Sequence, residues 1–295
     1  MSQPFRLNKE GLINRNKKIS FTFNGKKLFG YEGDTIASAL IANGIHLVGR
    51  SFKYHRPRGF FGAGVEEPNA KLQVEFNGHS EPNVNATEME LVEGLSATSQ
   101  NCWPSVNFDI GAINNFLKMF FPAGFYYKTF MWPKSFWYKI YEPFIRKAAG
   151  LGVASIEKDK ERYEHKFEYC DLLVTGSGPS GLASAYAAAK NGAKVILAED
   201  KPRFGGTLLT DDVSIDNLSG KDWAEKIITE LKSMPNVTVK NRSQVFGYYD
   251  HNMLVMFERV SDHLEKKSKF TPRQRLWYIR AKETILSTGS IERPI

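Results

Sequence analysis

Three glycines and one carboxylate carry the clearest chemical signal in this sequence. Gly176, Gly178 and Gly181 have the spacing G-x-G-x-x-G, and Glu199 ends the next apolar stretch. A glycine-rich turn that opens a helix lets the backbone approach a pyrophosphate, which the N–H groups of the helix then bind. An acidic residue at the end of the following strand accepts hydrogen bonds from a ribose. The pattern therefore predicts a dinucleotide-binding site.

Each glycine of this turn has an expected part in binding. Gly176 permits the turn out of the strand, Gly178 leaves room for the pyrophosphate, and Gly181 lets the helix pack closely on the strand. Glu199 would repel a ribose 2′-phosphate, which favours NAD or FAD over NADP. The neighbouring candidate contacts to the dinucleotide are Ser177, Pro179, Ser180, Asp200, Lys201 and Arg203.

The elements around the turn follow the strand-helix-strand order that this fingerprint requires. Residues 169–175 are typical of a buried strand, and residues 179–190 form an alanine-rich helix that Gly192 ends. Residues 194–199 form the next strand. A glycine-rich turn without a ligand is the alternative, and the acidic strand end argues against it.

The first 110 residues have the pattern of a small β-rich domain. Asn-Gly pairs at 24–25 and 77–78 predict tight hairpin turns. Asp34 is placed to cap a short helix over residues 35–42, which Gly44 ends. Strands are expected over residues 19–23, 26–31 and 71–76. This order of elements is that of a β-grasp domain.

An aromatic segment separates the two regions. Of the 29 residues from 116 to 144, 13 are Phe, Trp or Tyr. We favour a connecting segment packed over the domain faces, because buried aromatics are the commoner case, over a partner-binding surface. We therefore expect an α+β domain joined to an α/β domain. The predicted parts are a β-grasp domain at 1–110, a connector at 111–165 and a Rossmann-like domain at 166–295.

Composition excludes several classes of function. The net charge of +8 comes without a nucleic-acid-reading module, so we expect no nucleic-acid partner. Cys102 and Cys170 are the two cysteines, which excludes a disulfide framework and a four-cysteine metal site. No apolar stretch reaches the ~20 residues that span a bilayer, and the first residues do not resemble a signal peptide. We expect a soluble, cytoplasmic protein without membrane contact, metal site or catalytic residue of its own.

Further motifs resemble flavoproteins with two dinucleotide-binding domains. Residues 204–207 (FGGT) and 287–290 (STGS) are similar to the second and third signatures of that family. Residues 243–250 resemble the strand whose backbone contacts the adenine, and residues 253–286 fit the family's β-meander. The cofactor contacts that this resemblance implies are Gly206, Thr207, Val245, Thr288 and Gly289.

Three more segments narrow the resemblance to the α-subunit family of heterotetrameric sarcosine oxidases. They are residues 49–59 (GRSFKYHRPRG), 62–69 (GAGVEEPN) and 101–104 (NCWP). The resemblance implies oxidative demethylation of sarcosine to glycine, with one-carbon transfer to tetrahydrofolate and production of hydrogen peroxide. It also implies β, γ and δ-type partner subunits, with the catalytic flavin in a partner chain. This chain would hold NAD, or alternatively FAD, without hydride transfer, and FMN is allowed at an inter-subunit interface.

The same resemblance implies that the family's chains continue past residue 295, so we expect a fragment or a truncated product. The family's β-grasp domain is similar to a plant-type 2Fe–2S domain, which requires C-x4-C-x2-C and a distant fourth cysteine. That spacing falls on Phe61, Glu66 and Asn69, with the fourth position near Thr87. None of the four is cysteine, so we expect no iron–sulfur cluster.

Two other functions stay open. A self-contained FAD-dependent NAD(P)H oxidoreductase would use the same fingerprint, but the sequence has no second G-x-G-x-x-G and no pair of redox-active cysteines. A non-catalytic interaction module of a related amine or opine dehydrogenase complex would use the β-grasp domain and the aromatic segment for docking. For a basic strip over residues 50–58 we favour a loop that packs on the neighbouring domain or subunit over direct contact with a ligand, and we expect its His55 to be non-catalytic.

Overall fold

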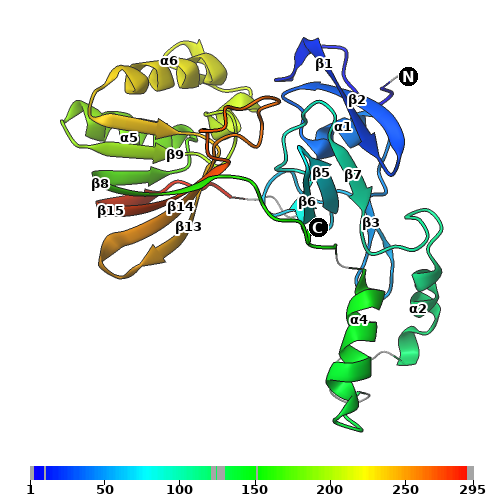
Figure 1. Ribbon diagram of the computed structural model, residues 1–295. Coiled ribbons are helices and arrows are strands. Elements are labelled where there is room, and N and C mark those ends of the chain that lie inside the picture. Colours follow the sequence, from blue (N-terminus) through cyan, green and yellow to red (C-terminus); the bar gives the residue numbers. More distant parts are fainter. Residues whose placement is uncertain (1–2, 10, 121–123, 125–129, 151, 291–295) are drawn as a thin grey trace. The chain divides into compact units, whose positions relative to one another are not determined.

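The computed structural model describes residues 3–290, apart from residue 10, residues 121–123, residues 125–129 and residue 151. The chain divides into two compact units, Met1–Asp159 and Lys160–Ile295 (Figure 1). Each unit has hydrophobic core clusters of its own. The predicted boundaries at residues 110 and 165 stay predictions.

Unit 1 is built on a five-stranded sheet of order β2-β1-β7-β5-β6. Its strands are β1 (Asn14–Phe23), β2 (Lys26–Glu32), β5 (Lys71–Phe76), β6 (His79–Asn85) and β7 (Ser96–Ser99). β1 and β7 run parallel, and the other neighbours are antiparallel. Both Asn-Gly pairs form the predicted hairpin turns, with positive φ at Asn24, Gly25, Asn77 and Gly78. The predicted β-grasp fold is confirmed.

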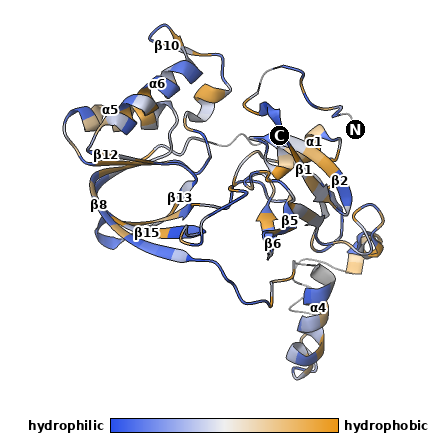
Figure 2. Ribbon diagram, turned by 45° about the horizontal axis from the view of Figure 1, so that its top comes forward, coloured by the Kyte–Doolittle hydropathy of each residue, from blue (hydrophilic) through white to orange (hydrophobic). Residues whose placement is uncertain are grey.

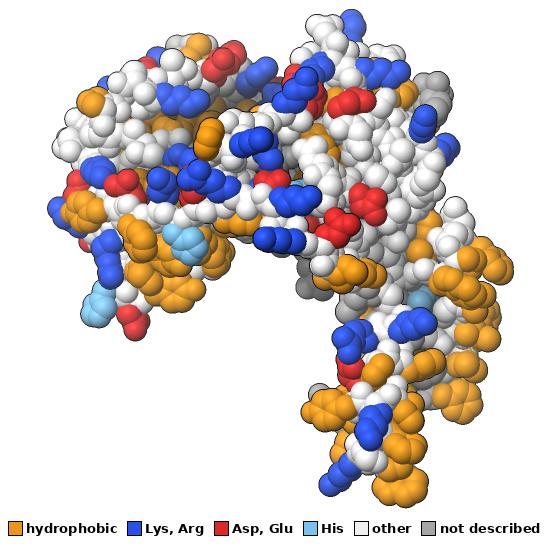
Figure 3. All heavy atoms as spheres, in the orientation of Figure 1, with side chains coloured by type: hydrophobic (Ala, Val, Ile, Leu, Met, Phe, Trp, Pro, Cys, Tyr) orange, Lys and Arg blue, Asp and Glu red, His pale blue; other side chains and the backbone are white. Residues whose placement is uncertain are grey.

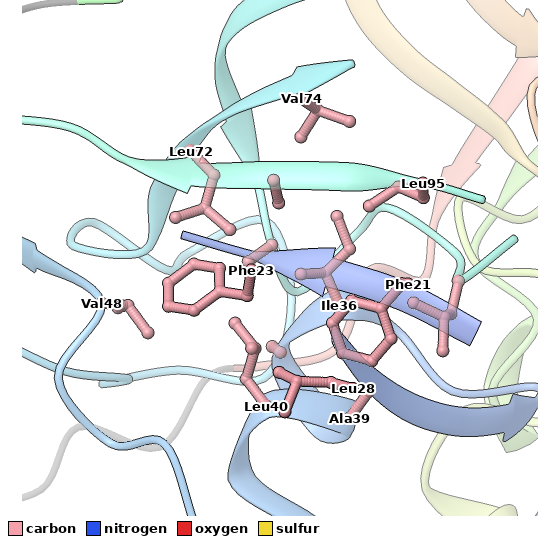
Figure 4. Close-up of a cluster of buried hydrophobic side chains, with 14 of the residues drawn as sticks. Phe21, Phe23, Leu28, Ile36, Ala39, Leu40, Val48, Leu72, Val74 and Leu95 are labelled. Carbon is pink, nitrogen blue, oxygen red and sulfur yellow. The ribbon is translucent and has the colours of Figure 1, made fainter. Parts of the chain in front are cut away.

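Helix α1 (Ile36–Ala42) covers one face of this sheet and closes its core. Ile36 and Leu40 of the helix lie against Phe21, Phe23 and Leu72 of the strands (Figure 4). All five side chains are at most 3% exposed. Burying a side chain of this size contributes about 1.5–3 kcal/mol, so the helix is held by packing more than by its own seven residues.

The predicted helix cap at Asp34 is wrong by one residue. Thr35 is the N-cap: its hydroxyl accepts the N–H of Ser38, and the Ser38 hydroxyl accepts the N–H of Thr35. The Asp34 carboxylate is buried and already bound, since it forms an ion pair with Arg6 at 2.7 Å and accepts the N–H of Tyr31. A carboxylate committed to these donors cannot also cap the helix.

A short hairpin and an aromatic arm complete unit 1. The hairpin strands are β3 (Gly49–Arg50) and β4 (Pro57–Arg58). We call residues 103–149 the aromatic arm; its elements are η1 (Ile110–Ala112), α2 (Ile113–Phe116), η2 (Lys118–Phe120), the π-helix η3 (Trp137–Tyr141) and α4 (Glu142–Ala149). At its root, His55 of the hairpin loop is buried with Nδ1 2.7 Å from Asp109 Oδ2.

In the described part of the aromatic arm, many large apolar side chains lie in solvent. Among the described residues, Phe116 is 84% exposed, Met119 86%, Trp132 82% and Phe144 72%. Figure 2 shows hydrophilic residues along α4, and Figure 3 shows apolar side chains gathered over the arm. The sequence favours a connecting segment whose aromatic side chains pack over the domain faces. In unit 1 these side chains instead lie outside the hydrophobic core.

Unit 2 is built on a six-stranded sheet of order β12-β9-β8-β15-β14-β13. Its strands are β8 (Tyr163–Thr175), β9 (Val195–Ala198), β12 (Val237–Lys240), β13 (Ser243–Tyr249), β14 (Met253–Arg259) and β15 (Gln274–Leu286). The first four strands in that order are parallel, and β15, β14 and β13 form an antiparallel meander. The predicted Rossmann-like fold with its β-meander is confirmed.

Two helices cover one face of this sheet. α5 (Pro179–Lys190) follows β8 and α6 (Gly220–Ser233) precedes β12, and both pack into one apolar cluster with the strands. The remaining elements are η4 (Gly206–Leu209), β10 (Ser214–Ile215), β11 (Leu218–Ser219) and η5 (Asp250–Asn252). A smaller cluster around Ile279 and Met256 fills the other face. None of the helices in the described residues is long and apolar enough to cross a membrane.

Candidate functional site

The candidate site lies where the strand order of unit 2 reverses. β8 and β15 are neighbours in the sheet, while the chain runs outward from β8 through β9 to β12 on one side. In such open sheets, ligands bind in the crevice beyond the carboxyl ends of the strands at this switch point. The fingerprint turn follows β8, and residues 287–289 follow β15, so both signatures meet there.

Two of the three fingerprint glycines are required by the fold itself. Gly176 has a φ of +96°, and a Cβ at this position would lie 2.3 Å from the carbonyl oxygen of Ser287. A Cβ on Gly181 would lie 1.9 Å from the carbonyl oxygen of Gly176. Both contacts are far shorter than van der Waals distance, so no other residue allows β8, α5 and the end of β15 to approach this closely.

Gly178 is different, because the fold leaves space beside it. Its φ is −65°, and a Cβ there would meet no atom within 4 Å. It is the N-cap of α5, and no side chain caps this helix terminus, so the first N–H groups of the helix point at the open space. A Cβ on Gly206 would lie 2.9 Å from the Gly178 Cα, which brings η4 to the same place. This is the cradle that a pyrophosphate would fill.

Glu199 and Ser177 form a buried polar cluster beside the turn. Glu199 is 6% exposed and Ser177 is fully buried. The Ser177 hydroxyl donates to Glu199 Oε2 at 2.5 Å, and the Ser177 N–H donates to the same oxygen at 2.9 Å. The Ser177 hydroxyl oxygen also accepts the N–H of Gly205 at 3.1 Å. Through these hydrogen bonds, Ser177 connects the fingerprint turn to the acidic end of β9 and to the turn at Gly205 and Gly206.

Sequence reasoning placed Ser177 in the site but missed this role. Ser177 is one of the variable positions of the fingerprint, so the spacing of the glycines gives no signal for it. The available signal was chemical: a small hydroxyl side chain next to Gly176 can reach a carboxylate on the adjacent parallel strand, and β8 pairs with β9.

Burial, the largest effect, and the neighbouring Asp200 carboxyl group raise the pKa of Glu199 above its ordinary value. The Ser177 hydroxyl and the backbone N–H groups of Lys201 and Ser177 act in the opposite direction, because they stabilise the carboxylate. The Lys201 N–H lies 3.1 Å from Glu199 Oε1. These donors hold the carboxylate in place, while its burial makes the ionised form less favourable than in water. A carboxylate fixed in this way is suited to accept hydrogen bonds from ribose hydroxyl groups.

The other candidate residues surround this centre. Asp200, Lys201 and Arg203 follow β9, and the Asp200 carbonyl oxygen accepts from Arg259 at 2.7 Å. Thr207 lies in η4, and Pro179 and Ser180 open α5. A Cβ on Gly176 would lie 3.3 Å from the Thr288 nitrogen, so Thr288 and the following Gly289 adjoin the turn.

Val245 lies on β13, next to the end of β9. The N–H of Ser243, where β13 begins, donates to the Glu199 carbonyl oxygen at 2.8 Å. Val245 is two residues further along the strand, partly buried against the apolar cluster of the second face. The fold thus places Val245 near the carboxyl end of β9, and the contact of the predicted residues with a dinucleotide stays a prediction.

Two domain families match this chain, one in each unit. Residues 16–102 match the 2Fe-2S iron-sulfur cluster binding domain, and residues 171–255 match the FAD dependent oxidoreductase family. Fold, fingerprint and matches define the class: a chain that joins a β-grasp domain of the 2Fe–2S type to a dinucleotide-binding domain similar to those of FAD dependent oxidoreductases.

Relatives narrow the class further. The chain is 54% identical to the sarcosine oxidase α subunit of Rhizobium meliloti (strain 1021) over 99% of its length, covering 30% of that protein. It is 33% identical to the sarcosine oxidase α subunit of Corynebacterium sp. (strain U-96), over 100% of this chain and 26% of the relative. The chain is a homologue of sarcosine oxidase α subunits, which confirms the resemblance. It spans 26–30% of the length of these curated relatives.

More distant relatives share part of the chain or its fold. One chain of the opine oxidase of Agrobacterium tumefaciens (strain Ach5) is 27% identical over 43% of this chain and 25% of that protein. Among solved structures, L-proline dehydrogenase from P. horikoshii aligns with 99% of this chain and 44% of that chain, at a TM-score of 0.60 and 19% identity. That likeness supports the fold.

The prediction of no iron–sulfur cluster is contradicted. The match of residues 16–102 assigns the first domain to a family of 2Fe–2S cluster-binding domains, so the prediction is wrong as stated. The thiols of the chain do not complete a four-cysteine ligand set: Cys102 and Cys170 are the two cysteines, one in each unit. Burial raises the pKa of Cys170 to about 11, so its thiol stays protonated near neutral pH. We therefore derive no chemistry through a cluster.

Proposed function

We propose that this chain is the dinucleotide-binding part of an α-type subunit in a sarcosine oxidase-like complex. The single observation that carries the proposal is the cradle at the switch point, where Gly178 leaves open space and an uncapped helix terminus faces it. The homology to sarcosine oxidase α subunits supports the activity of the whole assembly, oxidation of the C–N bond of a secondary amine.

The residues of this chain hold the ADP half that NAD and FAD share. The N–H groups at the start of α5 bind the pyrophosphate, and Gly178 gives it access. Glu199, oriented by Ser177, accepts the hydrogen bonds of the adenosine ribose. A bound dinucleotide would supply redox capacity or, in the role that we favour, would stabilise the structure without hydride transfer.

Catalysis of amine oxidation belongs to a partner chain in this proposal. We assign no acid, base or nucleophile at the dinucleotide site, because the buried carboxylate of Glu199 is committed to backbone and hydroxyl donors. The partners are β, γ and δ-type subunits, and the aromatic arm offers them an apolar surface. Cys102 and Cys170 are both free thiols, which supports a cytoplasmic location.

The decisive experiment uses Gly178→Ala. The methyl group fits the unliganded fold, since no atom lies within 4 Å of it, but it occupies the space of the pyrophosphate. We expect calorimetry to show binding of ADP, NAD or FAD to the unchanged chain, and a loss of at least about tenfold in the variant. Unchanged binding in Gly178→Ala would contradict the proposal.

Ala187→Ser is the matched control, because Ala187 is exposed near the other end of α5. It should bind like the unchanged chain, with the same circular dichroism. The ligand series also tests the rival function: a self-contained reductase would retain a flavin absorption band after purification and consume NAD(P)H. Binding without NAD(P)H turnover supports the role within a larger complex.

A further inference from the structure

Unit 1 contains a second hollow that the dinucleotide site does not use. Its walls are the hairpin β3–β4, the loop at Pro68 and Asn69, the start of β5 at Lys71, and Asn101. The cavity volume is about 200 Å³. One water needs only ~10–15 Å³, so the hollow accommodates a small molecule.

The charge of this hollow is one-sided. Arg50, Arg58 and Lys71 line it, and among the described residues its lining contains no Asp or Glu. The Arg50 guanidinium donates to the carbonyl oxygens of Val106 at 2.9 Å, His55 at 3.2 Å and Asn107 at 3.4 Å, which leaves two of its five N–H groups for a ligand. These acceptors are neutral, so they fix the position of the cation without cancelling its charge.

The other two cations have room to turn toward a ligand. Within the part of the chain that the structure describes, the side chains of Arg58 and Lys71 form no hydrogen bond and no ion pair. Three like charges around one concavity repel each other and focus a positive potential into it. An anion in the hollow removes this repulsion and gains charge-assisted hydrogen bonds.

The hollow also offers a hydroxyl donor and an apolar rim. The Ser51 hydroxyl oxygen accepts the N–H of Arg56 at 2.9 Å, which leaves its proton available to donate. Phe52, also in the lining, is 45% exposed and presents its ring to solvent. The lining of this one small hollow therefore combines cations, a hydroxyl donor and an aromatic side chain.

We propose that this hollow binds a phosphate monoester, with the phosphoryl group among Arg50, Arg58 and Lys71 and its organic part against Phe52. A phosphate monoester is a dianion near neutral pH, which matches three cations better than the single charge of a carboxylate. Planar guanidinium groups bind phosphate oxygens in pairs. The lining residues of this hollow all belong to unit 1, whereas the dinucleotide cradle is built from residues of unit 2.

The test is a calorimetric titration of the whole chain with phenyl phosphate, inorganic phosphate and phenol, in the presence of saturating NAD. NAD occupies the dinucleotide cradle and has no terminal phosphate, so phosphate binding in the cradle does not interfere. We expect saturable one-to-one binding of phenyl phosphate, weaker binding of inorganic phosphate and none of phenol. Absence of saturable phenyl phosphate binding would overturn the proposal.

The double variant Arg58→Gln, Lys71→Gln removes the two cations that form no ion pair. Binding of phenyl phosphate should weaken at least about tenfold. The control Lys26→Gln, Lys27→Gln removes the same charge from exposed positions of β2, and its affinity should stay within about threefold of the unchanged chain. Equal weakening in both double variants would show a general counterion effect and would also overturn the proposal.

Discussion

At the scale of single residues, Ser177 decides how the acidic strand end is presented. Its hydroxyl donates to the Glu199 carboxylate and accepts the Gly205 N–H, so it orients the carboxylate without contacting solvent. Glu199 then combines a raised pKa with fixed geometry. Because the folded-state pKa is raised, the folded state loses stability as the pH rises through the range between the ordinary and the raised pKa.

Binding should respond to pH in the opposite sense. The ionised Glu199 accepts ribose hydroxyl groups, so affinity for NAD, which has no titrating terminal phosphate, should fall as the pH is lowered through the raised pKa. Ser177→Ala removes a donor that lowers this pKa, so the midpoint should move to higher pH, and Glu199→Gln should flatten the profile. Calorimetric affinities across pH test this. If Ser177→Ala left the midpoint unchanged, Ser177 would contribute to packing but would not lower the pKa of Glu199.

At the scale of elements, the loop between the hairpin β3–β4 and β5 depends on one carboxylate. Glu67 is 1% exposed. Its Oε2 accepts the N–H groups of Phe61 at 2.5 Å and Gly62 at 2.6 Å, and its Oε1 accepts that of Asn69 at 2.6 Å. A loop with little regular structure is thus closed around a buried acceptor, because buried backbone donors require partners.

Glu67→Gln should destabilise unit 1. The amide keeps the size of the side chain but presents one oxygen in place of two, so it leaves backbone donors without a partner and costs about 1–3 kcal/mol. Thermal unfolding followed by circular dichroism measures the loss. Glu66→Gln is the control: Glu66 is less buried and accepts the N–H groups of Ala63 and Gly64, so its effect should be smaller. Equal effects would argue against a special role of Glu67.

At the scale of the whole molecule, the aromatic arm is the largest departure from a self-sufficient fold. Phe116 and Phe120 are 84% and 77% exposed, and the basic residues Lys118, Lys134, Lys139, Arg146 and Lys147 accompany such side chains along the arm. Exposed apolar surface of this extent is typical of an interaction site. The basic surroundings favour an apolar partner surface with an acidic rim.

Replacing Phe116 and Phe120 by Ser should leave the fold intact, because neither side chain enters the core. Co-purification with β-type subunits of a sarcosine oxidase complex should drop at least about tenfold, since aromatic anchors carry much of an interface's binding energy. Phe167→Ser, at a 79% exposed position of unit 2, is the control. Normal assembly of the arm variant would place the interface elsewhere.

Local chemistry let the sequence predict the elements that depend on near neighbours. The Asn-Gly turns, the helix Pro179–Lys190 and the glycine fingerprint were all predicted in place, since turn geometry and helix periodicity are set within a few residues. The helix cap was missed by one residue because Asp34 is bound by the distant Arg6.

The tertiary structure decided the rest. β8 starts at Tyr163, not at residue 169, because its polar first half is held by pairing with β15, more than 100 residues away in sequence. The same holds for the hydrogen bond from Ser177 to Glu199, which joins two segments that no sequence motif links. It also holds for the hollow, whose lining comes from separate segments of unit 1. The sequence by itself determined which ligand class the turn suits. Only the folded chain decided which side chains surround it, because long-range pairing and burial depend on every element at once.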